Sequence, residues 1–235
     1  MKKIIVPVDF SEQSEFALKT AAKLAKKNNG EILALHMLEM SDAVLTKGDG
    51  MQNEKAVFFL KLAEQKFEEF LNKDFLEDIK VTPIVKHFKV FSEVNDVAAK
   101  SNADLIVMGS HGATGVKEFL VGSNTERVVR NSDIPVLVVK NDLSQTDFEI
   151  VVMACGFSED SIPAYHKASK MFDKIGTRMY MLYVNLPNDG FKSSAEIEQR
   201  VVNFFKKADG NLNRMSDVHY ISDYTVERGV INFSN

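Results

Sequence analysis

The chain has 235 residues, 45% of them hydrophobic and 26% charged, which is the composition of a globular protein with one large or two small domains. A net charge of −4 without a long basic run argues against a nucleic-acid surface. A single cysteine excludes an internal disulfide framework. Because neither a signal peptide nor a long apolar span is visible, we expect a soluble, cytoplasmic protein without a membrane partner.

The N-terminal part of the chain alternates between strand and helix patterns. Residues 2–10 (KKIIVPVDF) predict a strand, with Pro7 near its end because proline lacks the N–H donor that a central position needs. Ser11 is placed to cap a helix with apolar residues at helical spacing, which ends at Asn28-Asn29-Gly30. Residues 31–37 (EILALHM) predict the second strand.

The same alternation continues to the middle of the chain. Residues 41–55 are polar and contain glycine, which predicts a long loop before a helix from about Lys55 to Leu71. Residues 78–88 predict the third strand and residues 90–100 a short helix. Strands that alternate with helices indicate an α/β fold with a parallel, doubly wound sheet.

Residues 104–140 form the most informative stretch, because they combine a buried strand with spaced glycines. Residues 104–109 (DLIVMG) predict a fourth strand buried on both faces. Its last residue, Gly109, begins the pattern Gly109-x2-Gly112-x9-Gly122-Ser123, and we expect Gly109 to take a positive φ and let other atoms approach the backbone. This spacing predicts a backbone cradle for phosphates at a helix N-terminus. Residues 135–140 (PVLVVK) close the stretch as the fifth strand.

Two interpretations stay open for the start of that helix. Ser123-x-x-Glu126 fits a capping box, which needs no ligand. Alternatively, Ser123, Asn124 and Thr125 add side-chain donors to the amides of a phosphate site. The stretch matches neither a Walker loop nor the dinucleotide GxGxxG motif.

Two further residues near this loop have alternative roles. In open parallel sheets, ligands bind outside the carboxyl ends of the strands, near a topological switch point. Asp9 lies there and either caps the turn before the first helix or accepts hydrogen bonds from a ribose or an adenine amine. His111 either contacts a phosphate or is a solvated loop residue.

The pattern then restarts, which indicates an internal repeat. Residues 149–160 (EIVVMACGFSED) parallel the first strand and its turn, so that Phe157 matches Phe10. Residues 175–185 parallel the second strand and residues 223–229 (DYTVERG) the third. In the second copy Gly156 replaces Asp9, and no second glycine loop, fourth strand or fifth strand follows. The cysteine of this copy, Cys155, is expected to be a buried small hydrophobe rather than a reactive thiol.

The residues quoted so far resemble the universal stress protein family, specifically its ATP-binding branch. The resemblance rests on VPVDFSE (residues 6–12), on the glycine spacing and on IPVLVVK (residues 134–140). It implies an open five-stranded parallel sheet of order 3-2-1-4-5. It also implies a bound adenine nucleotide, ATP or AMP/ADP, accompanied by Mg²⁺.

The resemblance also implies a set of nucleotide-binding residues. By position these are Pro7, Asp9, Met37, Met108, Gly109, Gly112, Gly122, Ser123, Asn124 and Thr125. Phe88 departs from the glycine common in the family, and Met37 replaces a commoner valine. Lys117 and Arg127 are left out of the site, because exposed basic residues seldom contact the ligand.

We therefore expect a complete nucleotide-binding domain at residues 1–142 and a degenerate, incomplete copy at residues 147–235. The expected function is stress-response regulation, with the nucleotide as a conformational or assembly switch. A weak ATPase or phosphotransferase is the alternative, although the loop offers no base except His111. The fifth strand, Pro135–Lys140, leaves an apolar edge that predicts a homodimer, and Ile150–Ala154 would be a second edge strand.

Overall fold

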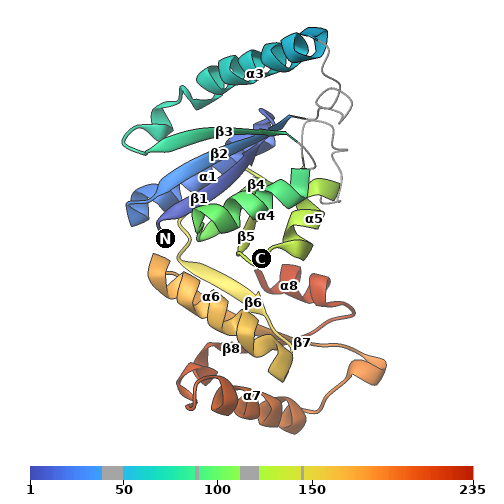
Figure 1. The fold of residues 1–235 in the computed structure, drawn as a ribbon. Helices are drawn as coiled ribbons and strands as arrows, with labels where there is room; N and C mark the ends of the chain where they lie inside the picture. The colour runs from blue at the N-terminus through green and yellow to red at the C-terminus, as the bar shows by residue number, and fades with distance from the viewer. Residues whose placement is uncertain (39–49, 88–89, 112–121, 144–145, 235) are drawn as a thin grey trace. The chain divides into compact units, whose positions relative to one another are not determined.

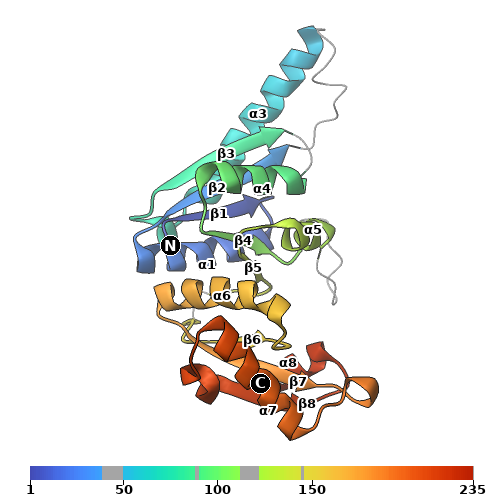
Figure 2. The same cartoon turned by 60° about the horizontal axis from the view of Figure 1, so that its bottom comes forward.

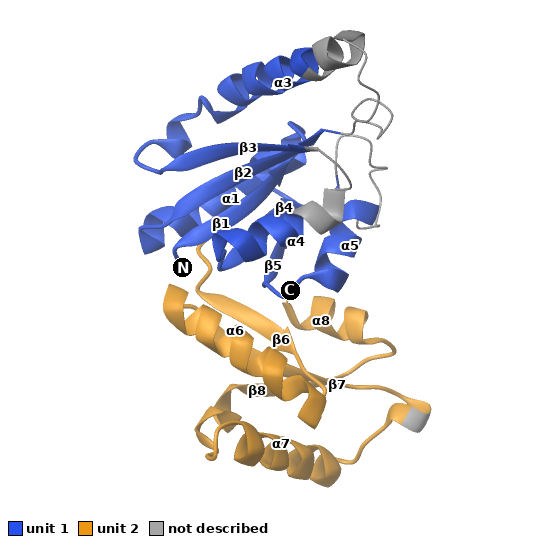
Figure 3. Cartoon of the chain, in the orientation of Figure 1, with its two compact units in different colours: residues 1–146 blue, residues 147–235 orange. Residues whose placement is uncertain are grey.

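The computed structural model describes residues 1–38, 50–87, 90–111, 122–143 and 146–234. The chain divides into two compact units (Figure 3), unit 1 from Met1 to Thr146 and unit 2 from Asp147 to Asn235. In the part of the chain that the structure describes, no helix is long and apolar enough to cross a membrane.

Unit 1 is built on a five-stranded parallel sheet (Figure 1). The strands lie in the order β3-β2-β1-β4-β5, which confirms the expected 3-2-1-4-5 order. The order reverses between β1 and β4, and this boundary is the topological switch point. The third strand is shorter than predicted, because it begins at Val81 instead of residue 78. The strands are β1 (Lys3–Val8), β2 (Glu31–Leu38), β3 (Val81–His87), β4 (Leu105–Gly109) and β5 (Val136–Val139).

Four helices of unit 1 lie within the described ranges, namely α1 (Glu12–Asn28), α3 (Gly50–Leu71), α4 (Val90–Ser101) and α5 (Ser123–Asn131). As predicted, α1 starts after Ser11, whose hydroxyl oxygen accepts a hydrogen bond from the amide of Ser14 at 3.2 Å. It ends at Asn29, which takes the left-handed conformation with φ 49°. The helix α3 begins five residues earlier than the predicted Lys55.

The two faces of this sheet are covered by different helices. Ile5, Leu35 and Ile106 pack with Val97 of α4 and Val128 of α5, so these two helices cover one face (Figure 2). Successive side chains of a strand point to opposite faces, so the buried Ile4, Val6 and Val8 face the other side, where α1 and α3 pack. The helices α4 and α5 therefore both lie on the face of the sheet that carries the candidate site.

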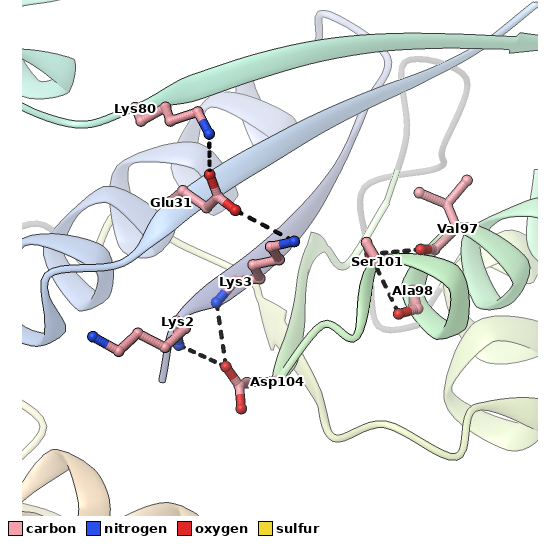
Figure 4. A network of polar contacts seen from close by, with 8 residues as sticks. All are labelled: Lys2, Lys3, Glu31, Lys80, Val97, Ala98, Ser101 and Asp104. Atoms are coloured by element: carbon pink, nitrogen blue, oxygen red, sulfur yellow. Dashed lines mark hydrogen bonds and ion pairs between the residues drawn. The ribbon is translucent and has the colours of Figure 1, made fainter.

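Charged groups gather at the amino ends of the strands (Figure 4). Glu31 accepts a hydrogen bond from Lys80 at 2.7 Å and pairs with Lys3 at 3.5 Å, and these cations lower the pKa of its carboxyl. Asp104 accepts hydrogen bonds from the amides of Lys2 and Lys3 at 2.6 and 3.2 Å. The network connects β1, β2 and the start of β4 at the amino ends of the strands, opposite to the carboxyl ends where the candidate site lies.

Unit 2 is built on a three-stranded parallel sheet of order β6-β7-β8. As predicted, Ile150–Ala154 forms an edge strand of the described sheet. The prediction of a third strand at residues 223–229 is wrong, because the strand comes earlier and α8 begins within that stretch. The elements are β6 (Ile150–Ala154), α6 (Ile162–Ile175), β7 (Arg178–Asn185), α7 (Ser194–Ala208), β8 (Val218–Ser222) and α8 (Val226–Ser234).

The start of α8 explains this error. The hydroxyl of Thr225 accepts a hydrogen bond from the amide of Arg228 at 3.2 Å, which is a helix-capping contact. Gly229 then allows α8 to lie directly on β7, since a Cβ atom there would lie 2.6 Å from Val184 Cγ1. The β-branched pair Thr225-Val226 resembles a strand in sequence, but the capping bond and the tertiary contact favour a helix.

The first turn of each unit contains a phenylalanine with a positive φ. Phe10 and Phe157 both take a positive φ, 65° and 49°, and follow the last residue of β1 and β6 by two and three residues. The ring of Phe10 packs edge-on against Phe67 at 5.3 Å, and that of Phe157 packs edge-on against Phe204, also at 5.3 Å. The predicted correspondence of the two phenylalanines thus extends to their backbone and packing.

Cys155 precedes this second turn and is buried, with 7% of its surface exposed. Its sulfur accepts a hydrogen bond from the amide of Phe157 at 3.3 Å, and burial raises the pKa of the thiol. Because a raised pKa disfavours the reactive thiolate, the cysteine acts as a small buried side chain, as expected.

Candidate functional site

The N-terminus of α5 is fastened to the carboxyl end of β4 by two hydrogen bonds. The hydroxyl of Thr125 donates to the carbonyl of Gly109 at 2.9 Å, and the amide of Gly122 donates to the carbonyl of Ser110 at 2.8 Å. Thr125 and Ser110 are 4% and 2% exposed, so the attachment is buried. It holds the start of the helix at the switch point of the sheet.

The first turn of α5 presents unpaired amides in the way an anion site requires. The first hydrogen bond of the helix runs from the amide of Glu126 to the carbonyl of Gly122 at 2.9 Å. The amides of Ser123, Asn124 and Thr125 precede that bond, so none of them has a partner within the helix. Ser123 and Asn124 are exposed, and the positive end of the helix dipole lies at this turn.

Of the two interpretations of the start of this helix, the capping box is not the one that the structure shows. The N-cap is Gly122, with φ −58° and no side-chain bond, and Ser123 is the first helical residue. The carboxylate of Glu126 instead accepts a hydrogen bond from Arg130 at 2.8 Å. The serine hydroxyl is therefore not used as a cap, which leaves the alternative of a ligand-facing role.

Gly109 is required for the close approach to its backbone that was predicted, and not for a positive φ. It ends β4 in extended conformation, and it is not among the described glycines with positive φ. A Cβ atom there would lie 3.0 Å from the backbone of Gln13, at the start of α1. The glycine therefore allows α1 to pack closely against the end of β4.

The end of β1 contributes Pro7 and Asp9. Asp9 is exposed, and its Oδ1 accepts hydrogen bonds from the amide and the hydroxyl of Ser11 at 3.0 and 2.5 Å. The turn-capping alternative for Asp9 is therefore realised, while a ligand contact stays a prediction. Pro7 is half-buried and lies two residues from Ile5, on the face that α4 and α5 cover.

Met37 and Met108 extend this face across the neighbouring strands. They are 9% and 6% exposed and belong to the same buried cluster as Ile5 and Val128. The structure thus brings Pro7, Met37 and Met108 to one face, with the start of α5 at its edge. Gly112, Phe88 and Lys117 lie outside the described residues.

His111 follows the end of β4, and one of its two ring nitrogens has no hydrogen-bond partner among the described residues. Its Nδ1 is hydrogen bonded to the hydroxyl of Ser110 at 3.0 Å. Its Nε2 is buried and has no hydrogen-bond partner among the described residues. A buried polar atom without a partner is costly, so this atom is suited to meet a ligand oxygen or a bound water.

The sequence analysis missed His36, which joins the ends of β1 and β2. Its Nδ1 lies 2.7 Å from the carbonyl of Val8, and because a carbonyl can only accept, Nδ1 carries the hydrogen. The ring packs against Phe10 at a centroid distance of 4.5 Å, and burial lowers the pKa of the imidazole. The available signal was a histidine between the apolar residues of this strand. His36 positions the turn that carries Asp9.

Among the described residues, no group of three or more histidine, cysteine, aspartate or glutamate side chains could hold a metal ion. A magnesium ion bound chiefly by phosphate oxygens and water needs only one or two protein ligands. The described residues therefore fit a metal ion that a phosphate ligand brings with it, and not a metal ion bound mainly by protein side chains.

The fold and the site define an open, doubly wound α/β protein with a helix N-terminus held at its switch point. Residues 1–140 match the family model described as Universal stress protein family. The chain belongs to this family, which confirms the resemblance seen in the sequence.

Two curated relatives each match 59% of the chain. Universal stress protein MJ0577 of Methanocaldococcus jannaschii is 35% identical over 153 residues, which cover 59% of this chain and 94% of the relative. Universal stress protein MJ0531 of the same organism is 35% identical over 146 residues, covering 59% and 82%.

Two solved structures extend the comparison. The structure of MJ0577 is 34% identical with a TM-score of 0.53, covering 60% of this chain and 96% of that one. A universal stress protein from Archaeoglobus fulgidus DSM 4304 is 25% identical with a TM-score of 0.60, covering 98% of this chain and 82% of that one. The second similarity therefore spans both units.

Proposed function

We propose that unit 1 binds an adenine nucleotide, ATP or AMP/ADP, and that the nucleotide acts as a conformational or assembly switch in a cytoplasmic stress response. The observation that carries this proposal is the attachment of α5 to β4 at the switch point, through Thr125 and Gly109. It supplies a rigid helix N-terminus where the ligands of open parallel sheets bind.

The phosphates would lie at the start of α5. The amides of Ser123, Asn124 and Thr125 are available to phosphate oxygens, and Gly122 has no side chain to occupy that space. Gly112 belongs to the proposed site by sequence spacing alone. Magnesium would arrive with the phosphates, since the described residues offer no protein cage.

The adenosine would lie across the ends of β1, β2 and β4. Pro7, Met37 and Met108 share the face that leads to α5, and Gly109 ends the strand beside them. Asp9 would contact the ribose or the adenine amine while it holds its turn. Apolar walls with a few polar groups are typical of small-molecule sites.

A specific observation keeps an enzyme as the second candidate. The buried Nε2 of His111 has no partner among the described residues, so it would be available to orient a water molecule if the phosphates lie at the start of α5. A weak ATPase or phosphotransferase would also need charge stabilisation, for which the loop has no Walker lysine. The regulatory role therefore remains the first candidate.

Identification of nucleotide released from the purified protein tests the ligand, and calorimetry tests the site. We expect Asp9→Ala to weaken ATP binding by about tenfold, because a polar contact to the ligand is lost. Ser11→Ala is the matched control, since it removes the hydroxyl partner in the turn and keeps the carboxylate. If both variants weaken binding equally, Asp9 acts through the turn alone.

Single-turnover hydrolysis separates the two functions. A regulatory protein leaves bound ATP intact over many minutes, and His111→Gln does not change that outcome. Turnover in contaminant-free protein that disappears in His111→Gln would establish the enzyme. Absence of any shift in melting temperature at millimolar ATP would contradict both functions.

The proposal includes the domain organisation and the assembly. Residues 1–142 would form the nucleotide-binding domain, and residues 147–235 a degenerate counterpart of its first part. The shared conformation of Phe10 and Phe157 supports this correspondence. Two chains would pair through the edge strand β5 to form a homodimer, because β5 has a neighbour on one side only in the described sheet.

A further inference from the structure

Unit 2 contains a hollow of about 460 Å³ at the carboxyl ends of β7 and β8. One wall comes from the segment after β7, with Leu186, Pro187 and Phe191. The other comes from the segment after β8, with Tyr224 and Arg228. The volume is within the range of small-molecule sites, and the hollow lies where parallel sheets place their ligands.

Two aromatic side chains line the hollow and are largely exposed. Phe191 is 62% exposed and Tyr224 is 75% exposed. Large apolar side chains gathered around one concavity are typical of binding surfaces, whereas isolated ones are ordinary. The two rings offer apolar surface to a flat molecule entering from solvent.

The segment that carries Phe191 is held by Asn185, the last residue of β7. Asn185 is 8% exposed, and its side-chain amide donates to the carbonyl of Lys192 at 3.0 Å. Its side-chain oxygen accepts from the amide of Lys192, also at 3.0 Å. Both polar atoms of the Asn185 side chain therefore bond to Lys192, the residue next to Phe191. These two bonds fix the position of the backbone that carries Phe191.

The segment that carries Tyr224 is held by Asp223. The side chain of Asp223 is 8% exposed and accepts hydrogen bonds from the amide of Tyr224 and from Asn232, both at 2.7 Å. The amide of Asp223 donates to the carbonyl of Asn185 at 3.3 Å, which joins the two walls. The aromatic residues are therefore presented by a fixed framework, which lowers the cost of ordering them on binding.

Arg228 gives the hollow its accessible charge. Its Nε lies 3.6 Å from Asp223, but its side chain is 65% exposed while that of Asp223 is 8% exposed. The guanidinium also lies 5.7 Å from the ring centre of Tyr224, a cation–π distance. A ligand in the hollow thus meets a cation beside an aromatic ring, and the carboxylate is shielded from it.

We propose that unit 2 binds a small planar aromatic acid in this hollow. The ring contacts Phe191 and Tyr224, and the acid group pairs with the guanidinium of Arg228. A nucleoside triphosphate is disfavoured, because residues 147–235 carry no spaced-glycine cradle and Gly156 stands in the position of Asp9. The site is separate from the proposed nucleotide site and does not depend on it.

Fluorescence anisotropy of 2-naphthoate, titrated with the full chain, tests the proposal. The chain has no tryptophan, so the probe is read without indole background. We expect Phe191→Ala and Tyr224→Ala each to weaken binding about fivefold or more, because each removes one aromatic contact. Arg228→Gln should weaken binding of the acid about threefold and leave the neutral 2-naphthalenemethanol unaffected.

The matched control is Leu212→Ala, which truncates an exposed apolar residue of unit 2 outside the lining of the hollow. It should bind the probe as the wild type does. Excess ATP with magnesium should not displace the probe. Binding that survives both aromatic substitutions, or that ATP abolishes, would overturn the proposal. Circular dichroism of each variant shows that the fold is retained.

Discussion

Thr125 donates its hydroxyl hydrogen to the carbonyl oxygen of Gly109 over 2.9 Å, and both groups are buried. The bond crosses 16 residues of sequence and joins the first turn of α5 to the last residue of β4. A helix N-terminus attracts anions wherever it lies, but only a fixed one can select a ligand geometry. The contact therefore relates the fold of unit 1 directly to its proposed function.

Thr125→Val tests this contact, because valine keeps the shape and removes the hydroxyl. The Gly109 carbonyl would lose a buried partner, so we expect the free energy of unfolding to fall by about 1–2 kcal/mol. ATP affinity, measured by calorimetry, should fall severalfold as the start of α5 loosens. Thr125→Ser retains the hydroxyl and should restore most of the affinity. Equal affinity in the two variants would contradict a positioning role.

Gly122→Val tests the phosphate cradle. A branched side chain at the N-cap would occupy the space beside the free amides, so we expect ATP binding to fall below detection in calorimetry. Gly156→Val in unit 2 is the control, since a Cβ atom there meets nothing within 4 Å. That variant should bind ATP normally. If Gly122→Val also binds normally, the phosphates lie elsewhere.

Much of unit 1 could be predicted from sequence because its signals are local or repeated. Apolar runs that alternate with helix patterns located the strands, and the family resemblance supplied their order. The capping-box alternative at Ser123 places the N-cap one residue too late, since Gly122 serves as the N-cap without a side chain. The local sequence pattern does not distinguish a helix capped by Gly122 from one capped by Ser123.

Tertiary contacts account for the other differences. The need for glycine at position 109 comes from Gln13, which approaches only after α1 has packed on β4. The helix at residues 226–234 depends on the contact between Gly229 and Val184 of β7. His36 was overlooked because its partner, the Val8 carbonyl, lies 28 residues away. Each of these contacts joins residues from different segments, so no local sequence pattern indicates it.

Val138→Pro tests the proposed dimer. The carbonyls of Pro135 and Val139 accept hydrogen bonds from Ile106 and Ser110 of the β4 side, so alternate residues of β5 face β4. Val136 and Val138 therefore direct their backbone groups to the free edge. Proline at position 138 removes an edge donor and leaves the β4 ladder intact. Light scattering should show the mass fall from twice 26.4 kDa to 26.4 kDa.

The control for this variant is Leu137→Pro, whose amide faces β4. It should lower the melting temperature, because it removes a ladder bond inside unit 1. If Val138→Pro remains dimeric while it melts like the wild type, the two chains pair through another surface. A wild-type chain that is monomeric at micromolar concentration would exclude the strand-mediated dimer directly.

Tyr165 gives unit 2 a distinct dependence on alkaline pH. It is 1% exposed and donates a hydrogen bond to Asp209 at 2.5 Å; burial, and then this bond, raise its pKa to about 12 from an ordinary value of 10.0. The unfolded chain loses this proton at a lower pH than the folded chain does. The stabilisation by protonated Tyr165 is therefore complete below about pH 10. It is lost as pH rises toward 12. The free energy of unfolding should therefore fall across this window.

Tyr165→Phe isolates this effect. The variant should be about 1 kcal/mol less stable than the wild type near pH 8, because it loses the bond to Asp209. The gap between the two proteins should narrow near pH 11, as measured by urea unfolding at both values. Tyr224→Phe, at a largely exposed position, should keep the wild-type dependence. A gap that stays constant between the two pH values would show that folding does not raise the pKa of Tyr165.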